Sequence, residues 1–194
     1  MPRGLSITCP NWRAWYVKCI NFLCGLLGIV VEIDETVAVR RKYGVGRVVV
    51  KNNVWLFGSV ERGNSSNCFL TALEGQKRNA QTLLPLIQQF IKPGIEIHSD
   101  SWAAYNTISC LPEGYLHKKV NHTENFVDPE CGAHTQTIEG QWHLVKEKFK
   151  RHFGTSDSTY KTYFPEFMWR KKFGDPNDVF FNFWTHVAMF YPCE

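Results

Sequence analysis

The segment GIVVEIDE, residues 28–35, is an apolar run that ends in acidic residues. In a β-strand, alternate side chains face opposite sides, so Val31 and Ile33 share one face while Glu32 and Asp34 share the other. The segment therefore predicts a buried strand that delivers carboxylates at its C-terminal end. A strand that runs out into solvent and finishes with charge would have the same sequence, and this segment alone does not separate the two interpretations.

A second segment, IEIHSD at residues 95–100, repeats the pattern and ends in Asp100. The residues before it, 79–91, carry apolar side chains at helical spacing and predict a helix. A strand that follows such a helical crossover can lie parallel to the first strand, which would place Asp34 and Asp100 at the same edge of the sheet. Two acids at two strand ends suggest one shared site.

The remaining segments extend this into one α/β domain. Short links join the first three expected strands, which predicts an antiparallel meander, and the last two strands are expected to run parallel to the first. The further expected strands are residues 54–60, 68–73 and 116–120, with a turn at 61–67, and the further expected helices are 102–108, 135–152, 160–170 and 178–191.

Composition is consistent with one folded domain carrying appendages. A chain of 194 residues with 44% hydrophobic residues can bury a substantial core and is not typical of disorder. The net charge of +4 favours an anionic partner only weakly. We expect a helical extension at residues 1–28, a central α/β domain at 29–172 and a helical tail at 173–194.

The seven cysteines form no CxxC pair and are odd in number, so they predict neither a zinc ribbon nor a complete disulfide framework. A reducing, intracellular compartment is the simpler interpretation. His122, Cys131 and His134 also fit no closed tetrahedral zinc pattern. The apolar run 19–31 is too short to span a bilayer and is interpreted as a packing segment.

A third acid lies in the helix predicted at 135–152. Ile138, Trp142 and Val145 form an apolar stripe along it, and Glu139 lies on the adjoining face. Carboxylates that converge from separate elements suit Mg²⁺, and two such ions can promote displacement at phosphorus. Spacing alone is a weak argument, because a chain with 18 acidic residues offers many such triplets.

Two neighbours of Asp34 are also acidic. Strand geometry does not exclude Glu32, which shares the face of Asp34, whereas Glu35 faces away.

Basic residues offer candidate contacts to phosphate groups. Arg40, Arg41 and Lys42 follow the first strand, Lys146 lies two turns along the helix from Glu139, and Arg170 belongs to a later basic run. Each of these side chains could equally be a solvated surface charge.

Six motifs in order resemble the ISXO2-like (IS1595) transposase domain, and most closely the eukaryotic Merlin transposases, over about residues 30–170. They are VEIDE at 31–35, WLFGSVERG at 55–63, LLPLIQQFIKPG at 83–94, HSDSWAAY at 98–105, VNHTENFVDPECGAHTQTIEGQWHLVK at 120–146 and EFMWR at 166–170.

This resemblance implies an RNase H-like fold, with a five-stranded mixed sheet flanked by helices, and DDE transposase activity. Asp34 in VEIDE, Asp100 in HSDSWAAY and Glu139 in TIEGQW correspond to the metal-binding acids of that family. The implied reaction uses two Mg²⁺ or Mn²⁺ ions to hydrolyse DNA at transposon ends, after which the 3' hydroxyl attacks target DNA. The resemblance also implies DNA as partner, action as a homo-oligomer on DNA and, in a eukaryote, a nuclear location.

One departure from the family pattern supports an alternative. Family members usually carry a DNA-binding region before the catalytic domain, whereas about 28 residues precede VEIDE here, without zinc-ribbon cysteines or a recognisable helix-turn-helix. The alternative hypotheses are a transposase-derived, non-catalytic DNA-binding or interaction protein, and an inactive remnant.

Overall fold

The computed structural model describes residues 24–25, 28–39, 54–73, 75, 77–124, 126–151 and 157–191. The helix expected within residues 1–28 lies almost entirely outside these ranges, and so do Arg40, Arg41 and Lys42.

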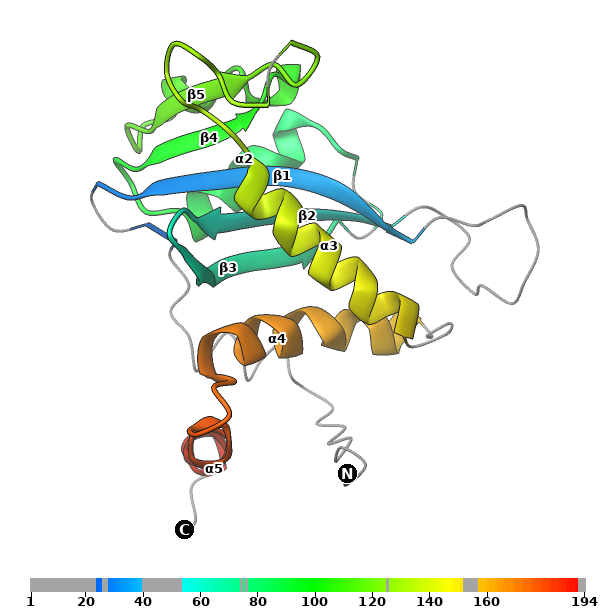
Figure 1. Ribbon diagram of the computed structural model, residues 1–194. Helices are drawn as coiled ribbons and strands as arrows, with labels where there is room; N and C mark the ends of the chain where they lie inside the picture. Colours follow the sequence, from blue (N-terminus) through cyan, green and yellow to red (C-terminus); the bar gives the residue numbers. More distant parts are fainter. Residues whose placement is uncertain are drawn as a thin grey trace, which may run out of the picture.

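A five-stranded mixed sheet forms the centre of the domain (Figure 1). Strands β1 (Val30–Val39), β2 (Val54–Glu61) and β3 (Asn64–Ala72) form an antiparallel meander, and β4 (Glu96–Asp100) and β5 (Leu116–Val120) run parallel to β1. The strand order is β3-β2-β1-β4-β5. The predicted α/β fold class, with the sheet expected of an RNase H-like domain, is therefore confirmed.

Helix α2 (Ala80–Phe90) is the crossover that makes β4 parallel to β1. The Asn79 side chain caps it by accepting a hydrogen bond from the Thr82 amide at 3.1 Å. Its apolar face buries Leu83 and Ile87 in the core. This helix begins and ends within one residue of the predicted bounds.

Three further helices follow the sheet strands. Figure 1 shows α3 (Gln136–Arg151) crossing one face of the sheet, α4 (Asp157–Phe173) running beside β3, and α5 (Val179–Phe190) lying beyond α4. Within the ranges described above, none of the helices combines the length and apolar character that crossing a membrane requires.

The predicted end of the first strand was wrong. Strand β1 continues past the acids to Val39, because its pairing with β2 extends to Val39 opposite Val54. Its pairing with β4 covers only Val30–Glu32. The acids therefore lie inside β1, close to the point where β4 stops pairing with it.

Two other predicted boundaries also need correction. The turn expected at 61–67 spans only Arg62 and Gly63, because Gly63 adopts a φ of 83° and lets β3 begin at Asn64. The helix expected at 102–108 consists of two short 3₁₀ helices, η1 (Ala103–Tyr105) and η2 (Ile108–Cys110).

Gly58 in β2 permits α3 to lie close to the sheet. A Cβ atom at this position would stand 2.5 Å from Cη2 of Trp142 and 2.8 Å from Cδ2 of Leu70. We expect Gly58→Ala to lower the free energy of unfolding by about 1–3 kcal/mol, because the extra methyl overpacks a filled core. Urea denaturation measures this change.

Gly140→Ala, on α3, is the matched control. Apart from its chain neighbours and the backbone of its own helix, no described heavy atom lies within 4 Å of a Cβ at Gly140, so alanine should leave stability unchanged or raise it through its better helix propensity. Equal stability of Gly58→Ala and wild type would contradict the close approach of α3.

His117 in β5 predicts a pH dependence of stability. Burial lowers the pKa of His117 to about 4, and its Nε2 lies 2.8 Å from Oγ of Ser99. Between pH 6.5 and 4 the unfolded chain binds this proton more readily than the folded chain, so stability falls as the pH falls. Because His117 is only partly buried, we expect wild type to lose about 1 kcal/mol more than His117→Gln between pH 7 and 5 in urea titrations. If the free energy of unfolding changed equally with pH in the two proteins, the lowered pKa of His117 would be contradicted.

Candidate functional site

Asp34 and Asp100 occupy corresponding positions on neighbouring parallel strands. Where β1 pairs with β4, the last pair is Glu32 with His98. Asp34 lies two residues beyond Glu32, and Asp100 lies two residues beyond His98. Residues two apart in a strand face the same side. The backbone therefore brings these two carboxylates to one face of the sheet, where the two strands stop pairing, as the crossover argument predicted.

Helix α3 holds Asp34 directly. The indole N–H of Trp142 donates a hydrogen bond to Oδ2 of Asp34 at 2.9 Å. Gly58, opposite Asp34 on β2, leaves the space that the indole ring fills. Helical spacing predicts Trp142 in the apolar stripe of this helix, but no feature of the sequence predicts its hydrogen bond to Asp34.

The electrostatics of Asp34 connect it with the two other acids. Burial raises the pKa of Asp34 to about 6, while hydrogen bonds from the Glu35 backbone and from Trp142 oppose this rise. The charges of Asp100 and Glu139 raise the pKa further. Charges carried by β4 and α3 therefore act on the carboxylate that β1 carries.

Asp100 is held by the backbone that follows it. It is the last residue of β4, and its Oδ1 accepts a hydrogen bond from the Trp102 amide at 3.1 Å.

Glu139 lies in the first turn of α3 with its side chain half exposed. Its Oε1 accepts a hydrogen bond from the Thr135 hydroxyl at 3.0 Å, and Nε2 of His122 lies 3.7 Å from the same oxygen. The hydroxyl of Thr135 is also 2.8 Å from that His122 nitrogen. Polar contacts of the loop before α3 therefore hold the third acid.

The donor chemistry of these three side chains suits Mg²⁺ or Mn²⁺, both of which prefer oxygen ligands. Across the described ranges, however, no three His, Cys, Asp or Glu side chains are close enough together to hold a metal ion. The ligand types fit a divalent metal site, but the three side chains are not arranged as a complete metal-binding cluster.

Glu32, the rival to Asp34, has a different role. Its side chain is fully buried and accepts hydrogen bonds from the backbone amides of Thr137 at 2.8 Å and Ile138 at 3.1 Å. Its Oε1 also accepts a hydrogen bond from the Thr137 hydroxyl at 2.9 Å and forms an ion pair with Nε of Arg62 at 2.9 Å. Both carboxylate oxygens are therefore engaged, and Glu32 caps the N-terminus of α3.

Glu35 faces away from Asp34, as predicted. The Tyr105 hydroxyl donates to its Oε1, and Nη2 of Arg78 lies 3.2 Å from its Oε2. Burial raises the pKa of Glu35 to about 7. The Arg78 guanidinium also stacks on the rings of Trp55 and Trp102, at 4.5 and 4.0 Å. Glu35 thus belongs to a buried cluster on the opposite side of β1.

Two of the candidate DNA contacts are described by the structure. Lys146 is a partly buried residue of α3, the helix that carries Glu139. Arg170 is exposed in the last turn of α4, and its Nε lies 2.7 Å from Oε1 of Glu166. Because α4 packs beside β3, two strands away from β1, the structure does not bring Arg170 to the carboxylates.

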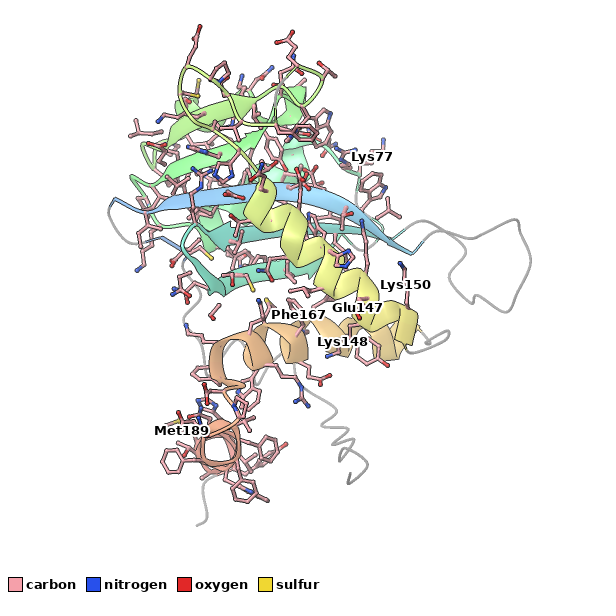
Figure 2. All side chains as sticks on the ribbon, viewed as in Figure 1. Lys77, Glu147, Lys148, Lys150, Phe167 and Met189 are labelled. Carbon is pink, nitrogen blue, oxygen red and sulfur yellow. The ribbon has the colours of Figure 1, made fainter. Side chains whose placement is uncertain are left out.

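A lysine bridges α3 and α4. Nζ of Lys148 lies 3.0 Å from Oε2 of Glu166, and Figure 2 shows this lysine between the two helices.

Comparison with known proteins identifies the domain. Residues 25–172 match the ISXO2-like transposase domain. A Haemophilus influenzae (strain ATCC 51907 / DSM 11121 / KW20 / Rd) protein named "Uncharacterized transposase-like protein" is 25% identical over 89 residues, which cover 46% of this chain and 69% of that protein.

Three solved structures show distant similarity. A chain of the simian T-cell lymphotropic virus intasome in complex with PP2A regulatory subunit B56 gamma has a TM-score of 0.46 and 13% identity, covering 73% of this chain and 47% of that one. The BIV integrase catalytic core domain has a TM-score of 0.44 and 12% identity, covering 73% and 81%. The Mos1 strand transfer complex has a TM-score of 0.31 and 14% identity, covering 74% and 53%.

The family match spans all five strands and α3, and therefore every element that carries one of the three acids. This chain belongs to the ISXO2-like transposase domain family.

Proposed function

We propose that the domain is a DDE-type transposase catalytic domain that cleaves and joins DNA strands with divalent metal ions, using Asp34, Asp100 and Glu139. The observation that carries this proposal is geometric: Asp34 and Asp100 lie at corresponding positions on neighbouring parallel strands, and the helix that carries Glu139 contacts Asp34 through Trp142. In a transposase-like domain, acids that neighbouring strands and the helix packed on them carry in this way are the candidates for metal ligands.

Each residue of the site has a specific role in the proposed reaction. Asp34, Asp100 and Glu139 would hold two Mg²⁺ or Mn²⁺ ions, which when bound would activate the attacking hydroxyl and stabilise the leaving oxygen. The Trp142 indole N–H orients Asp34, and the Trp102 amide orients Asp100. The Thr135 hydroxyl orients Glu139.

We further propose that DNA is the partner, and that Lys146 contacts a phosphate close to the carboxylates. Arg40, Arg41, Lys42 and Arg170 would also contact DNA, and the net charge of +4 supports such contacts weakly. A homo-oligomer on DNA, a nuclear location in a eukaryotic cell and a relationship closest to the Merlin transposases belong to the same proposal.

Replacement of Asp100 tests the catalytic assignment. We expect Asp100→Asn to slow the nicking of supercoiled plasmid in Mg²⁺ or Mn²⁺ by at least about 100-fold, because the amide removes a charged metal ligand without a change of shape. Gel electrophoresis of the plasmid forms measures the rate.

The matched control is Asp178→Asn. Asp178 precedes α5, far along the chain from the three acids, and its side chain makes no capping hydrogen bond. This variant should nick at the wild-type rate. If wild type and Asp100→Asn nicked plasmid equally fast, the catalytic proposal would fail.

The second candidate function is non-catalytic DNA binding. It is favoured by the basic run Arg170, Lys171 and Lys172 in the last turn of α4, away from the carboxylates. Salt-dependent DNA binding that EDTA leaves unchanged, together with no nicking by wild type, would support this second function.

Metal binding also predicts a change in stability without DNA. Because the raised pKa of Asp34 reflects burial and repulsion from Asp100 and Glu139, Mg²⁺ should stabilise the folded state by neutralising this charge. We expect saturating Mg²⁺ to raise the Tm of wild type and Asp178→Asn by several degrees, and that of Asp34→Asn by much less. Differential scanning fluorimetry measures these shifts, and equal shifts in all three proteins would contradict the metal assignment.

A further inference from the structure

We propose that Arg62 is a positioning residue of the site. With Glu32 it holds the first turn of α3 on the sheet and thereby fixes the position of Glu139 relative to Asp34 and Asp100. The effect on DNA cleavage rests on the proposed function, whereas the effect on helix position does not.

The first step of the argument is the cap that Glu32 provides. Glu32 lies in β1, 105 residues before Thr137, yet it accepts both the amide and the hydroxyl of Thr137 and the amide of Ile138. Amide groups of the first turn have no partners within their own helix, and the helix dipole favours a negative charge there. Glu32 therefore ties α3 to a defined point of the sheet, one residue before Glu139.

The second step is the position of Arg62, in the two-residue turn between β2 and β3. Its Nε donates to Oε1 of Glu32 at 2.9 Å, and its Nη2 donates to the backbone carbonyl of His134 at 3.0 Å. The same Nη2 lies 2.9 Å from Nδ1 of His98. One planar guanidinium thus joins β1, β4 and the segment that leads into α3, which the single ammonium of a lysine would not reproduce.

The third step extends the contacts along β4 towards Asp100. Since Nδ1 of His98 accepts from Arg62, the ring proton lies on Nε2, which donates to Oε1 of Glu96 at 2.7 Å. Glu96, His98 and Asp100 alternate along one strand and share a face. Arg62 is therefore linked to the strand of Asp100 as well as to the helix of Glu139.

Loss of Arg62 would remove the guanidinium from the buried charge of Glu32 and leave beside it, among the basic side chains that the structure describes, only the imidazole of His134, whose Nδ1 lies 3.2 Å from Oε1. The cap would then loosen, and the first turn of α3 would move relative to the sheet. Catalytic groups tolerate little displacement, and a misplacement of about 1 Å can slow a reaction about 100-fold. The expected consequence is a slower reaction with an intact overall fold.

Arg62 could instead bind a DNA phosphate, because its side chain is 27% exposed. The two roles make different predictions. A phosphate contact would weaken DNA binding and reduce its salt dependence, whereas a positioning residue would slow nicking by bound protein without a change in affinity.

The experiment compares the full chain with its Arg62→Gln and Thr137→Val variants. Lys92→Gln is the charge-matched control, because Lys92 lies in the loop after α2 and takes no part in these contacts. Three quantities are measured: the nicking rate of supercoiled plasmid at saturating protein, the Kd for a fluorescent 30-base-pair duplex at several salt concentrations, and the ¹⁹F NMR spectrum after 5-fluorotryptophan labelling. The Trp142 resonance, assigned with Trp142→Phe, reports the position of α3 against Asp34 because its indole bonds that carboxylate.

We expect Arg62→Gln to nick plasmid at least about tenfold more slowly, with a Kd within about twofold of wild type and an unchanged salt slope. Its Trp142 resonance should shift or broaden. Thr137→Val, which removes only the hydroxyl bond to Glu32, should change the rate and the resonance in the same direction by less. Lys92→Gln should match wild type in both the nicking rate and the Trp142 resonance.

A wild-type rate with a wild-type Trp142 resonance in Arg62→Gln would overturn the inference. A weakened Kd with a reduced salt slope and an unchanged resonance would overturn it in favour of a DNA contact. If Arg62→Gln fails to fold, the Thr137→Val variant tests the inference in its place. An unchanged Trp142 resonance in Thr137→Val would then overturn the inference. If wild type nicks no DNA, the proposed function fails, and the Trp142 resonance alone decides the role of Arg62.

Discussion

The buried carboxylate of Glu32 is the constraint on which the arrangement of the site depends. Moving an ionised carboxylate out of water costs several kcal/mol unless a cation and hydrogen-bond donors replace its hydration. Here Arg62 supplies the cation, and the first turn of α3 supplies three hydrogen bonds. Helix α3 therefore cannot slide along the sheet without breaking these three hydrogen bonds to a buried charge, and the position of Glu139 follows from that of Glu32.

A second contact holds the same helix further along its length. Trp142 lies three residues after Glu139, and its indole reaches over Gly58 to bond Asp34. The side chain that orients one acid thus belongs to the helix that carries another. Together with the corresponding positions of Asp34 and Asp100 on neighbouring strands, this explains how residues far apart in the chain raise the pKa of Asp34.

The three acids of residues 31–35 illustrate how surroundings decide the role of a residue type. Glu32 is enclosed by donors, which suits a structural cap. Asp34 faces the same side but lies where β4 ends, next to two other acids. Glu35 faces the opposite side, where Tyr105 and Arg78 surround it. A strand's alternation separates Glu35 from the others, and tertiary contacts alone separate Glu32 from Asp34.

The sequence by itself determined the local elements and much of the order of the sheet. Alternation in residues 28–35 and helical spacing in 79–91 depend on neighbours in the chain, so these elements could be predicted, and the crossover between them placed Asp34 near Asp100. Only the tertiary structure decided that β1 runs on to Val39, since pairing with β2 sets that end. It alone also revealed the cap by Glu32 and the bond from Trp142, because each joins residues more than 100 positions apart, and no local pattern encodes which buried donor meets which acid.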